Sequence, residues 1–257
     1  KLDVNVNVGV NMNERYYSYI DSQTSNLTFY TGFWDLSNGA TKDMLEEYQQ
    51  KRRLVGLFGD ITLGWDEMLF LDLTARNDWS STLPLNSNSY FYPGATLSWI
   101  FTKLIPKNNI LDFGKVRLAY GKTGNDANPY LTGHRFIQAY SNGYYGSDIL
   151  KFPFAGLNAF QAVSSIGSTD LKPEMTTEFE AGLNFALFGN RINVDFSFYN
   201  RNTNDQIFTL PVDPSTGYSY MVTNFGKVRN SGIELLVNTT PIKTKDFRWD
   251  LGFNFSK

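Results

Sequence analysis

The sequence predicts an all-β protein: an antiparallel up-and-down transmembrane β-barrel, of which about nine strands are present. Three observations predict this fold. Apolar and polar residues alternate with period two in nine separate segments. The apolar positions of these segments hold no Asp, Glu, Lys or Arg. Short and long connections between the segments alternate along the chain, as they do in bacterial outer-membrane barrels.

The first segment, from Leu2 to Met12, keeps its alternation for about a dozen residues, longer than an ordinary half-buried strand. Strands are predicted for the nine alternating segments 2–12, 55–65, 69–76, 95–101, 115–120, 178–187, 191–198, 233–238 and 247–256. A basic residue at a bilayer midplane costs about 2–4 kcal/mol, so an apolar face without charge is what lipid contact requires. A soluble sandwich also keeps charge out of its core, but its other face need only be wet.

The connections place the loops. The predicted short connections are 66–67, 102–110, 189–190 and 241–246, and the predicted long ones are about 20–50, 77–92, 124–170 and 203–218. In a meander this order places every long loop at the same end of the strands. A helix is predicted over 43–53, inside the first long loop.

One strand needs a special arrangement. Lys227 and Arg229 share the parity of Ile233, so this strand is predicted either to extend beyond the membrane above Ser231 or to bulge near Ser231 and Gly232.

Composition excludes several function classes. The 257 residues include no Cys and one His, with a net charge of -2, so disulfide scaffolds, zinc fingers, thiol catalysis and a basic nucleic-acid surface are not expected. Mean hydropathy is -0.31, and no apolar run approaches the roughly 18 residues of a membrane-spanning helix. We expect no catalytic site, cofactor or metal: His134 stands alone, and Gly121-Lys122-Thr123 lacks the first glycine of a phosphate-binding loop.

The polar faces of the strands carry the charged candidates. The residues predicted to face a lumen or a plug are Asp60, Asp72, Arg76, Arg117, Glu178, Glu180, Asp195, Glu234 and Asp250. Glu178 and Glu180 lie two apart on one face, but we interpret them as lumen residues rather than as a catalytic carboxylate pair.

Aromatic residues make up 16% of the chain, and several lie in the predicted long loops. The candidates for substrate contact are Trp79, Tyr90, Tyr92, Tyr130, Tyr144 and Tyr145. Their rings can stack on sugars; alternatively, they form an interfacial girdle or hold the loops together. The neighbouring Asn77-Asp78 and Ser80-Ser81 are predicted to form a turn and strand-end lock rather than a substrate site.

Several strings, in this order, resemble one known family. They are Arg76-Asn-Asp-Trp-Ser-Ser-Thr-Leu-Pro84, Tyr90-Phe-Tyr-Pro93, Phe113-Gly-Lys-Val-Arg-Leu-Ala-Tyr-Gly-Lys-Thr-Gly-Asn125, Leu171-Lys-Pro-Glu174, Val228-Arg-Asn-Ser-Gly-Ile-Glu-Leu235 and Trp249-x-x-Gly252-x-Asn254-x-Ser256. Together they resemble the SusC/RagA family of TonB-linked outer-membrane transporters, as found in Bacteroidetes. The likeness covers roughly residues 52–257.

The resemblance implies a 22-stranded barrel that holds an N-terminal plug and is opened through TonB-ExbB-ExbD. It also implies a SusD-like surface lipoprotein over the mouth, outer-membrane lipid around the wall, and oligosaccharide or peptide substrates. The sequence shows no plug domain, TonB box or closing strands, and residue 1 already opens a strand without a signal peptide before it. Nine is also an odd number, so residues 1–257 are expected to be a partial barrel domain from a longer polypeptide.

The function expected is TonB-dependent import across the outer membrane, with the long loops extracellular. Three alternatives stay open: a small passive porin, an outer-membrane barrel that acts as an adhesin or envelope scaffold, and a soluble lectin-like β protein.

Overall fold

The computed structural model describes residues 1–27, 32, 35–141 and 150–257. Its main feature is a single nine-stranded antiparallel sheet, and each of its strands pairs with whichever of the nine comes next in the sequence. In sheet order the strands are β1 (Leu2–Leu27), β2 (Gly39–Trp65), β3 (Leu69–Ser80), β4 (Ser89–Trp99), β5 (Leu111–Asn125), β11 (Glu174–Leu187), β12 (Ile192–Asn204), β15 (Lys227–Lys243) and β16 (Arg248–Ser256). The predicted fold class and its nine strands are confirmed.

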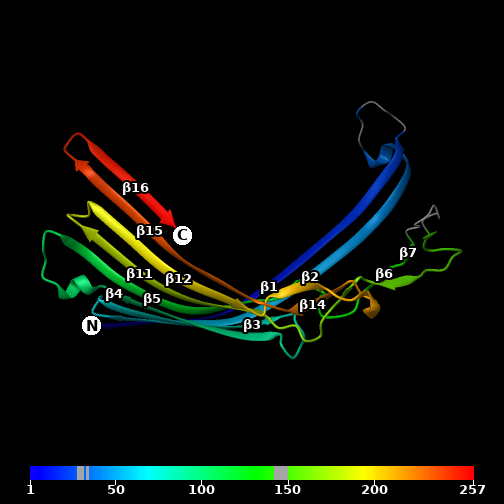
Figure 1. The fold of residues 1–257 in the computed structure, drawn as a ribbon, viewed down its shortest axis with the longest axis horizontal. Helices are drawn as coiled ribbons and strands as arrows, with labels where there is room; N and C mark the ends of the chain where they lie inside the picture. The colour runs from blue at the N-terminus through cyan, green and yellow to red at the C-terminus, as the bar shows by residue number, and fades with distance from the viewer. Residues whose placement is uncertain (28–31, 33–34, 142–149) are drawn as a thin grey trace.

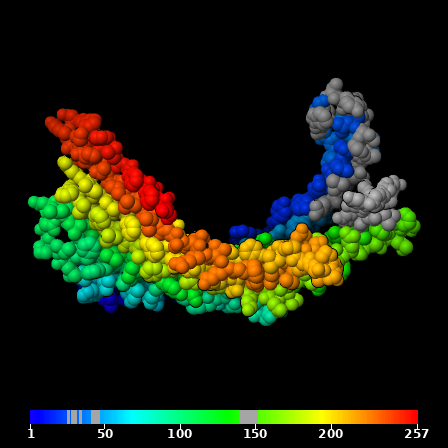
Figure 2. Space-filling model, viewed as in Figure 1, coloured from blue at the N-terminus to red at the C-terminus, as the bar shows by residue number. Residues whose placement is uncertain are grey.

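The sheet curves into a trough, with β1 and β2 rising at one side and β15 and β16 at the other (Figure 1). In space-filling view the trough is open and hollow (Figure 2). The connections after β2, β4, β11 and β15 lie at one end of the strands, and the loops that carry the remaining small strands lie at the other (Figure 1). Among the described residues, no helix combines the length and the apolarity needed to cross a membrane.

The turns at the first end are tight. Between β2 and β3, Asp66 and Glu67 both have positive φ values of 52° and 51°, as the central residues of a type I′ hairpin turn do. The backbone N–H of Met68 closes this turn by donating to the carbonyl of Trp65 at 2.9 Å. Between β4 and β5, the short helix η2 (Phe101–Leu104) leads into the connection.

The loop end contains additional small strands that the sequence did not predict. β6 (Phe136–Gln138) pairs with β9 (Phe160–Ala162), β7 (Tyr140–Ser141) pairs with β8 (Leu150–Lys151), and β14 (Tyr220–Asn224) lies between β10 (Ser165–Ile166) and β13 (Ile207–Pro211). Two further short helices are η1 (Leu36–Asn38) and η3 (Pro214–Thr216). A small buried core supports these loops and consists of Leu83, Tyr90, Ala127, Leu171 and Val222.

Two predictions about the loop end are wrong. The helix predicted over 43–53 is part of β2, whose strand register with β1 continues from Trp65 to Gly39. The connections predicted over 20–50 and 77–92 shorten to the residues between β1 and β2 and between β3 and β4. The physical reason is the same in both cases. Beyond the apolar band both faces of a strand are wet, so alternation of hydropathy no longer marks it.

The arrangement of β15 is also settled. Its register with β12 runs without a shift from Lys227 opposite Asn204 to Thr239 opposite Ile192. The alternative of a bulge near Ser231 and Gly232 is therefore wrong, and the strand continues unbroken through Arg229 to Lys227.

Candidate functional site

The polar face of the sheet carries all nine residues predicted to face a lumen or a plug. The strand register places Asp60, Asp72, Arg76, Arg117, Glu178, Glu180, Asp195, Glu234 and Asp250 on the face opposite the apolar band. A hollow of about 710 Å³ lies on this face between β5 and β16. Arg117, Glu178, Glu180, Asp195 and Glu234 are among the residues that line it.

Neighbouring charges on this face pair with one another. Arg117 donates to Glu180 at 2.7 Å and to the Ser197 hydroxyl at 3.2 Å, and Arg201 donates to Glu178 at 2.8 Å. Each glutamate therefore forms an ion pair with its own arginine, which keeps both carboxylates ionised on a hydrated surface. This arrangement does not suit a catalytic carboxylate pair that shares one proton. Among the described residues, no group of His, Cys, Asp and Glu could hold a metal ion.

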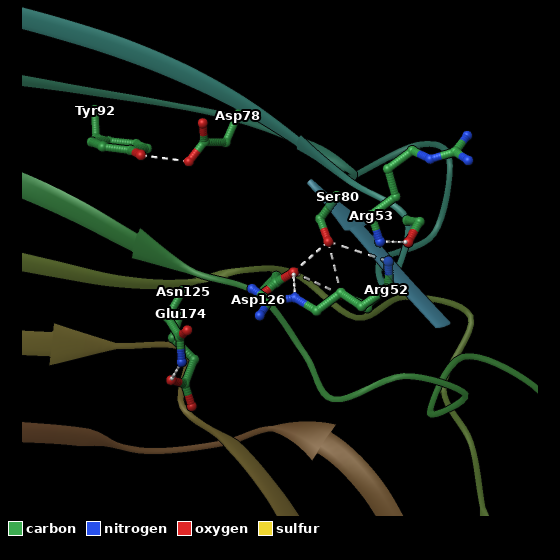
Figure 3. A network of polar contacts seen from close by, with 10 residues as sticks. Arg52, Arg53, Asp78, Ser80, Tyr92, Asn125, Asp126 and Glu174 are labelled. Atoms are coloured by element: carbon green, nitrogen blue, oxygen red, sulfur yellow. Dashed lines mark hydrogen bonds and ion pairs between the residues drawn. The ribbon is translucent and has the colours of Figure 1, made fainter. Parts of the chain in front are cut away.

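The loop end of the sheet is fastened by Asp126, at the start of the loop after β5. Its carboxylate accepts hydrogen bonds from Arg52 Nε at 2.9 Å and from the Ser80 hydroxyl (Figure 3). It also accepts a hydrogen bond from Thr82 Oγ1 at 3.1 Å. The Asp126 side chain is only 3% exposed. Residues from β2, from the end of β3 and from the loop after β5 thus meet at one buried anion. Arg52 Nη2 also donates to it, so two of its four donor groups are neutral hydroxyls.

A second network lies beside it on the polar face. Arg76 Nε donates to Asp78 at 2.8 Å. The Tyr92 hydroxyl donates to the other carboxylate oxygen of Asp78 (Figure 3). The Arg76 guanidinium also lies 5.8 Å from the centre of the Phe58 ring, within the range of a cation–π contact. The predicted strand-end lock around Asp78 and Ser80 is confirmed by these two networks. The turn predicted there is wrong for Asn77, Asp78 and Ser80, which all belong to β3.

The predicted substrate aromatics occupy different places. Tyr90 is buried in the loop core and stacks on Tyr92 with ring centres 6.0 Å apart. Trp79 lies opposite Val55, on the apolar face rather than the polar one. The Tyr130 hydroxyl accepts the backbone N–H of Lys51 at 3.0 Å and so covers an edge of β2. Tyr144 and Tyr145 lie outside the described residues.

The upper half of the β1–β2 hairpin is a feature that the sequence reasoning missed. On its polar face Tyr17, Tyr19 and Tyr48 form a ring cluster with centroid separations of 5.4–6.4 Å. Arg15 lies on the same face, directly opposite Arg52. The sequence carries no alternation to signal this part of the strand, because the residues from Asn13 to Tyr19 are polar or aromatic on both faces.

The opposite face of this hairpin is charged rather than apolar. Glu14 lies between Arg53 and Lys51, with ion-pair distances of 2.6 Å and 3.1 Å. Hydrogen bonds from Arg53 and then Lys51 hold the pKa of Glu14 below its ordinary value. The apolar band on β1 therefore ends at Met12, and the hairpin beyond it is polar on both faces.

The level at which the apolar face becomes polar differs between β2 and β15. It falls at Leu54 on β2 and at Gly232 on β15. Following the paired residues from strand to strand, Gly232 of β15 aligns with Thr62 of β2. Thr62 lies eight residues from Leu54 along β2, and β15 lies six strands from β2 in the sheet. With about 3.3 Å per residue and 4.8 Å per strand, this slope corresponds to strands tilted by about 40° against a flat polar boundary. Outer-membrane barrels have strand tilts of about 35–45°.

The comparisons with known proteins agree with this geometry. The profile of the family described as TonB dependent receptor-like, beta-barrel matches residues 1–257. The chain belongs to this family. Its members are outer-membrane β-barrels, so the tilt and the charge-free apolar face have a common explanation.

Relatives and structures within the family fit the predicted resemblance. TonB-dependent receptor P3 of Formosa agariphila is 29% identical over 87% of this chain and 22% of its own length. TonB-dependent receptor SusC of Bacteroides thetaiotaomicron is 29% identical over 81% of this chain and 21% of its own length. The predicted resemblance to the SusC/RagA family is confirmed. The chain spans about a fifth of the length of these relatives.

Two solved structures show the same fold. The RagAB peptide transporter superposes on the whole chain with a TM-score of 0.82, at 24% identity and over 28% of its own length. A ferric enterobactin receptor, PfeA of Pseudomonas aeruginosa, also superposes on the whole chain with a TM-score of 0.61, at 13% identity and over 33% of its length.

Proposed function

We propose that this chain forms part of the wall and of the extracellular loops of an outer-membrane transporter that imports oligosaccharides or peptides with energy delivered through TonB. The observation that carries the proposal is the sloping polar boundary on the charge-free face. A soluble sheet has no reason to keep such a boundary flat at a tilt of about 40°, whereas a bilayer surface imposes it.

The polar face supports the transport part of the proposal. Its paired charges and the hollow of about 710 Å³ suit the wall of a hydrated lumen that contacts a plug. We assign this role to the nine polar-face residues named above. Family membership supports a 22-stranded barrel, of which residues 1–257 are a partial domain. It also supports a plug that couples to TonB-ExbB-ExbD and a SusD-like lipoprotein at the mouth, as the matches to SusC and RagAB suggest.

Orientation can be tested by cysteine labelling, since the chain has no cysteine of its own. In a cysteine-free version of the full-length protein, Ser215→Cys would lie in an exposed loop at the long-loop end and Lys107→Cys in the connection between β4 and β5. A membrane-impermeant maleimide added to intact cells is expected to label Ser215→Cys at once and Lys107→Cys only after the outer membrane is opened. The reverse pattern would refute the proposed orientation, and labelling of both in intact cells would refute the barrel.

Import itself is tested by deleting the gene and, separately, tonB. Uptake of a labelled oligosaccharide or peptide mixture should fall to the same background in both strains. Uptake that survives loss of tonB would instead support a passive porin, and unchanged uptake without the gene would support a scaffold or adhesin.

A further inference from the structure

A cavity of about 330 Å³ lies where the β1–β2 hairpin meets the start of the loop after β5. Arg15, Tyr17 and Gln50 line it from the hairpin, Asn125 from the end of β5 and Asn128 from the loop that follows. The Asp126 network and the Tyr130 hydroxyl hold the loop against β2, so the two walls of the cavity are fixed relative to each other. The cavity is therefore pre-formed by segments that are far apart in the sequence.

The charge inside this cavity is not balanced. Arg15 and Arg52 lie directly opposite each other on one face of the strand pair, a placement that costs free energy for like charges. Asp126 compensates Arg52, whose ion pair with it is largely buried. No carboxylate among the described residues forms an ion pair with Arg15. A bound anion beside Arg15 would supply the missing compensation.

The rest of the lining is amide and aromatic. Tyr17 is 57% exposed, and its ring centre lies 6.4 Å from that of Tyr48 in the tyrosine cluster. Amides can donate to and accept from sugar hydroxyls, and an exposed tyrosine face is a stacking surface for a pyranose ring. Ala127 and Pro129 supply the small apolar part of the lining, which leaves little room for the apolar side chains of a peptide.

Between the cavity and the short-turn end of the sheet, the polar face of β1 carries a row of asparagine side chains. Asn13, Asn11, Asn7 and Asn5 follow Arg15 toward the short-turn end at a spacing of two, interrupted by Gly9. Asn7 Nδ2 donates to Asp60 at 2.9 Å, so at least one of these amides is oriented by its neighbour. A polyhydroxylated ligand that leaves the cavity along β1 would meet hydrogen-bonding groups at each step.

From these observations we propose that the cavity binds an anionic oligosaccharide. A carboxylate or sulfate of the sugar pairs with Arg15, the ring that carries it stacks on Tyr17, and the amides of Gln50, Asn125 and Asn128 bind its hydroxyls. This assignment rests on the proposed import function and narrows its substrate class.

The test uses the full-length receptor in detergent and binding measured by calorimetry. The probes are an oligogalacturonate, its methyl-esterified neutral counterpart, a sulfated galactan oligosaccharide, its desulfated counterpart, and a tryptic peptide mixture. At least one anionic probe is expected to bind at least about tenfold more tightly than its neutral counterpart. Arg15→Gln should weaken that binding about tenfold, as loss of one charge-assisted hydrogen bond does, and Tyr17→Ser should weaken it several-fold.

Matched controls come from the opposite face of the same hairpin. Lys51→Gln removes a charge at the same height, and Tyr16→Ser removes the neighbouring ring, but neither side chain lines the cavity. Both variants should bind the anionic probe as the unchanged protein does. Equal effects of Arg15→Gln and Lys51→Gln would overturn the assignment, as would equal binding of charged and neutral probes or the absence of binding by every anionic probe.

The binding and uptake experiments distinguish a wrong ligand assignment for this cavity from a wrong proposal of import. A neutral sugar or a peptide that binds and enters cells in a TonB-dependent manner leaves the import proposal standing and removes only the role of Arg15. Loss of import by Arg15→Gln for an anionic sugar alone, with peptide uptake unchanged, would support both.

Discussion

Replacing Asp126 by Ala tests whether one buried carboxylate holds the loop after β5 against the sheet. The change removes the acceptor of four hydrogen bonds, two of them from Arg52, and leaves Arg52 without its counter-ion. Removing one partner of a buried ion pair costs about 3–5 kcal/mol. Here the lower end applies, because the Arg52 side chain is 26% exposed and can reach water. The Ser80 and Thr82 hydroxyls also still bond each other at 2.9 Å. We expect a local loss of about 3 kcal/mol.

Hydrogen exchange on the full-length receptor measures this loss directly. At about 1.4 kcal/mol per factor of ten, the amides of residues 126–131 and 80–83 should exchange about 150-fold faster, while those of the strand centres should not change. Asp126→Asn keeps an acceptor for the hydroxyls and should lose roughly half as much. Asp170→Ala, an exposed change in the same loop, is the control. Exchange within twofold of the unchanged protein for Asp126→Ala would refute the argument that this anion fastens the loop.

Three further predictions concern the wall, the second network and the hairpin. Leu97→Arg places a cation on the apolar face and should lower the free energy of unfolding by about 2–4 kcal/mol, measured by urea titration in lipid. Thr96→Arg on the polar face should lower it much less. Equal losses would contradict the assignment of the two faces. Tyr92→Phe removes the hydroxyl bound to Asp78 and should speed local exchange by about tenfold, with no change at the short-turn end. Because the pKa of Glu14 is lowered, its ion pairs stabilise the hairpin at neutral pH, and this stabilisation is lost as pH falls through the lowered pKa. The backbone amides of the upper part of the β1–β2 hairpin should therefore lose protection from hydrogen exchange in acid. Glu14→Gln should abolish this pH dependence.

The wall was predictable from the sequence because lipid imposes a simple rule on it. Every strand segment between Leu2 and Ser256 that touches the apolar band shows alternation, and the charge-free face follows from the cost of burying charge in lipid. The order of the strands then followed from the alternating connections, since a meander has only one way to place them. The lock at Asp78 and Ser80 was predictable because these residue types cap turns and strand ends.

The loop end was less predictable because its elements are held by long-range contacts. Met44, Leu45 and Tyr48 have helical spacing, but residues 39–65 pair with β1, and tertiary pairing overrides a local pattern. Asp126 carries no local sign that it binds Arg52, which lies 74 residues away. The cavity beside Arg15 depends on that contact, so no pattern within β1 alone could have located it.

The strand register also bears on how members of this family can diverge. Asn125 at the end of β5 and Glu174 at the start of β11 are direct partners, and the Asn125 amide donates to the Glu174 carboxylate at 3.0 Å, so the ends of the intervening loop are clamped together (Figure 3). Lengthening a loop with joined ends costs only about 0.6 kcal/mol for each doubling. Insertions, deletions and exchanges between Asp126 and Pro173 can therefore accumulate without moving the nine strands of the main sheet, which gives evolution a region for changing ligand preference while the wall stays the same.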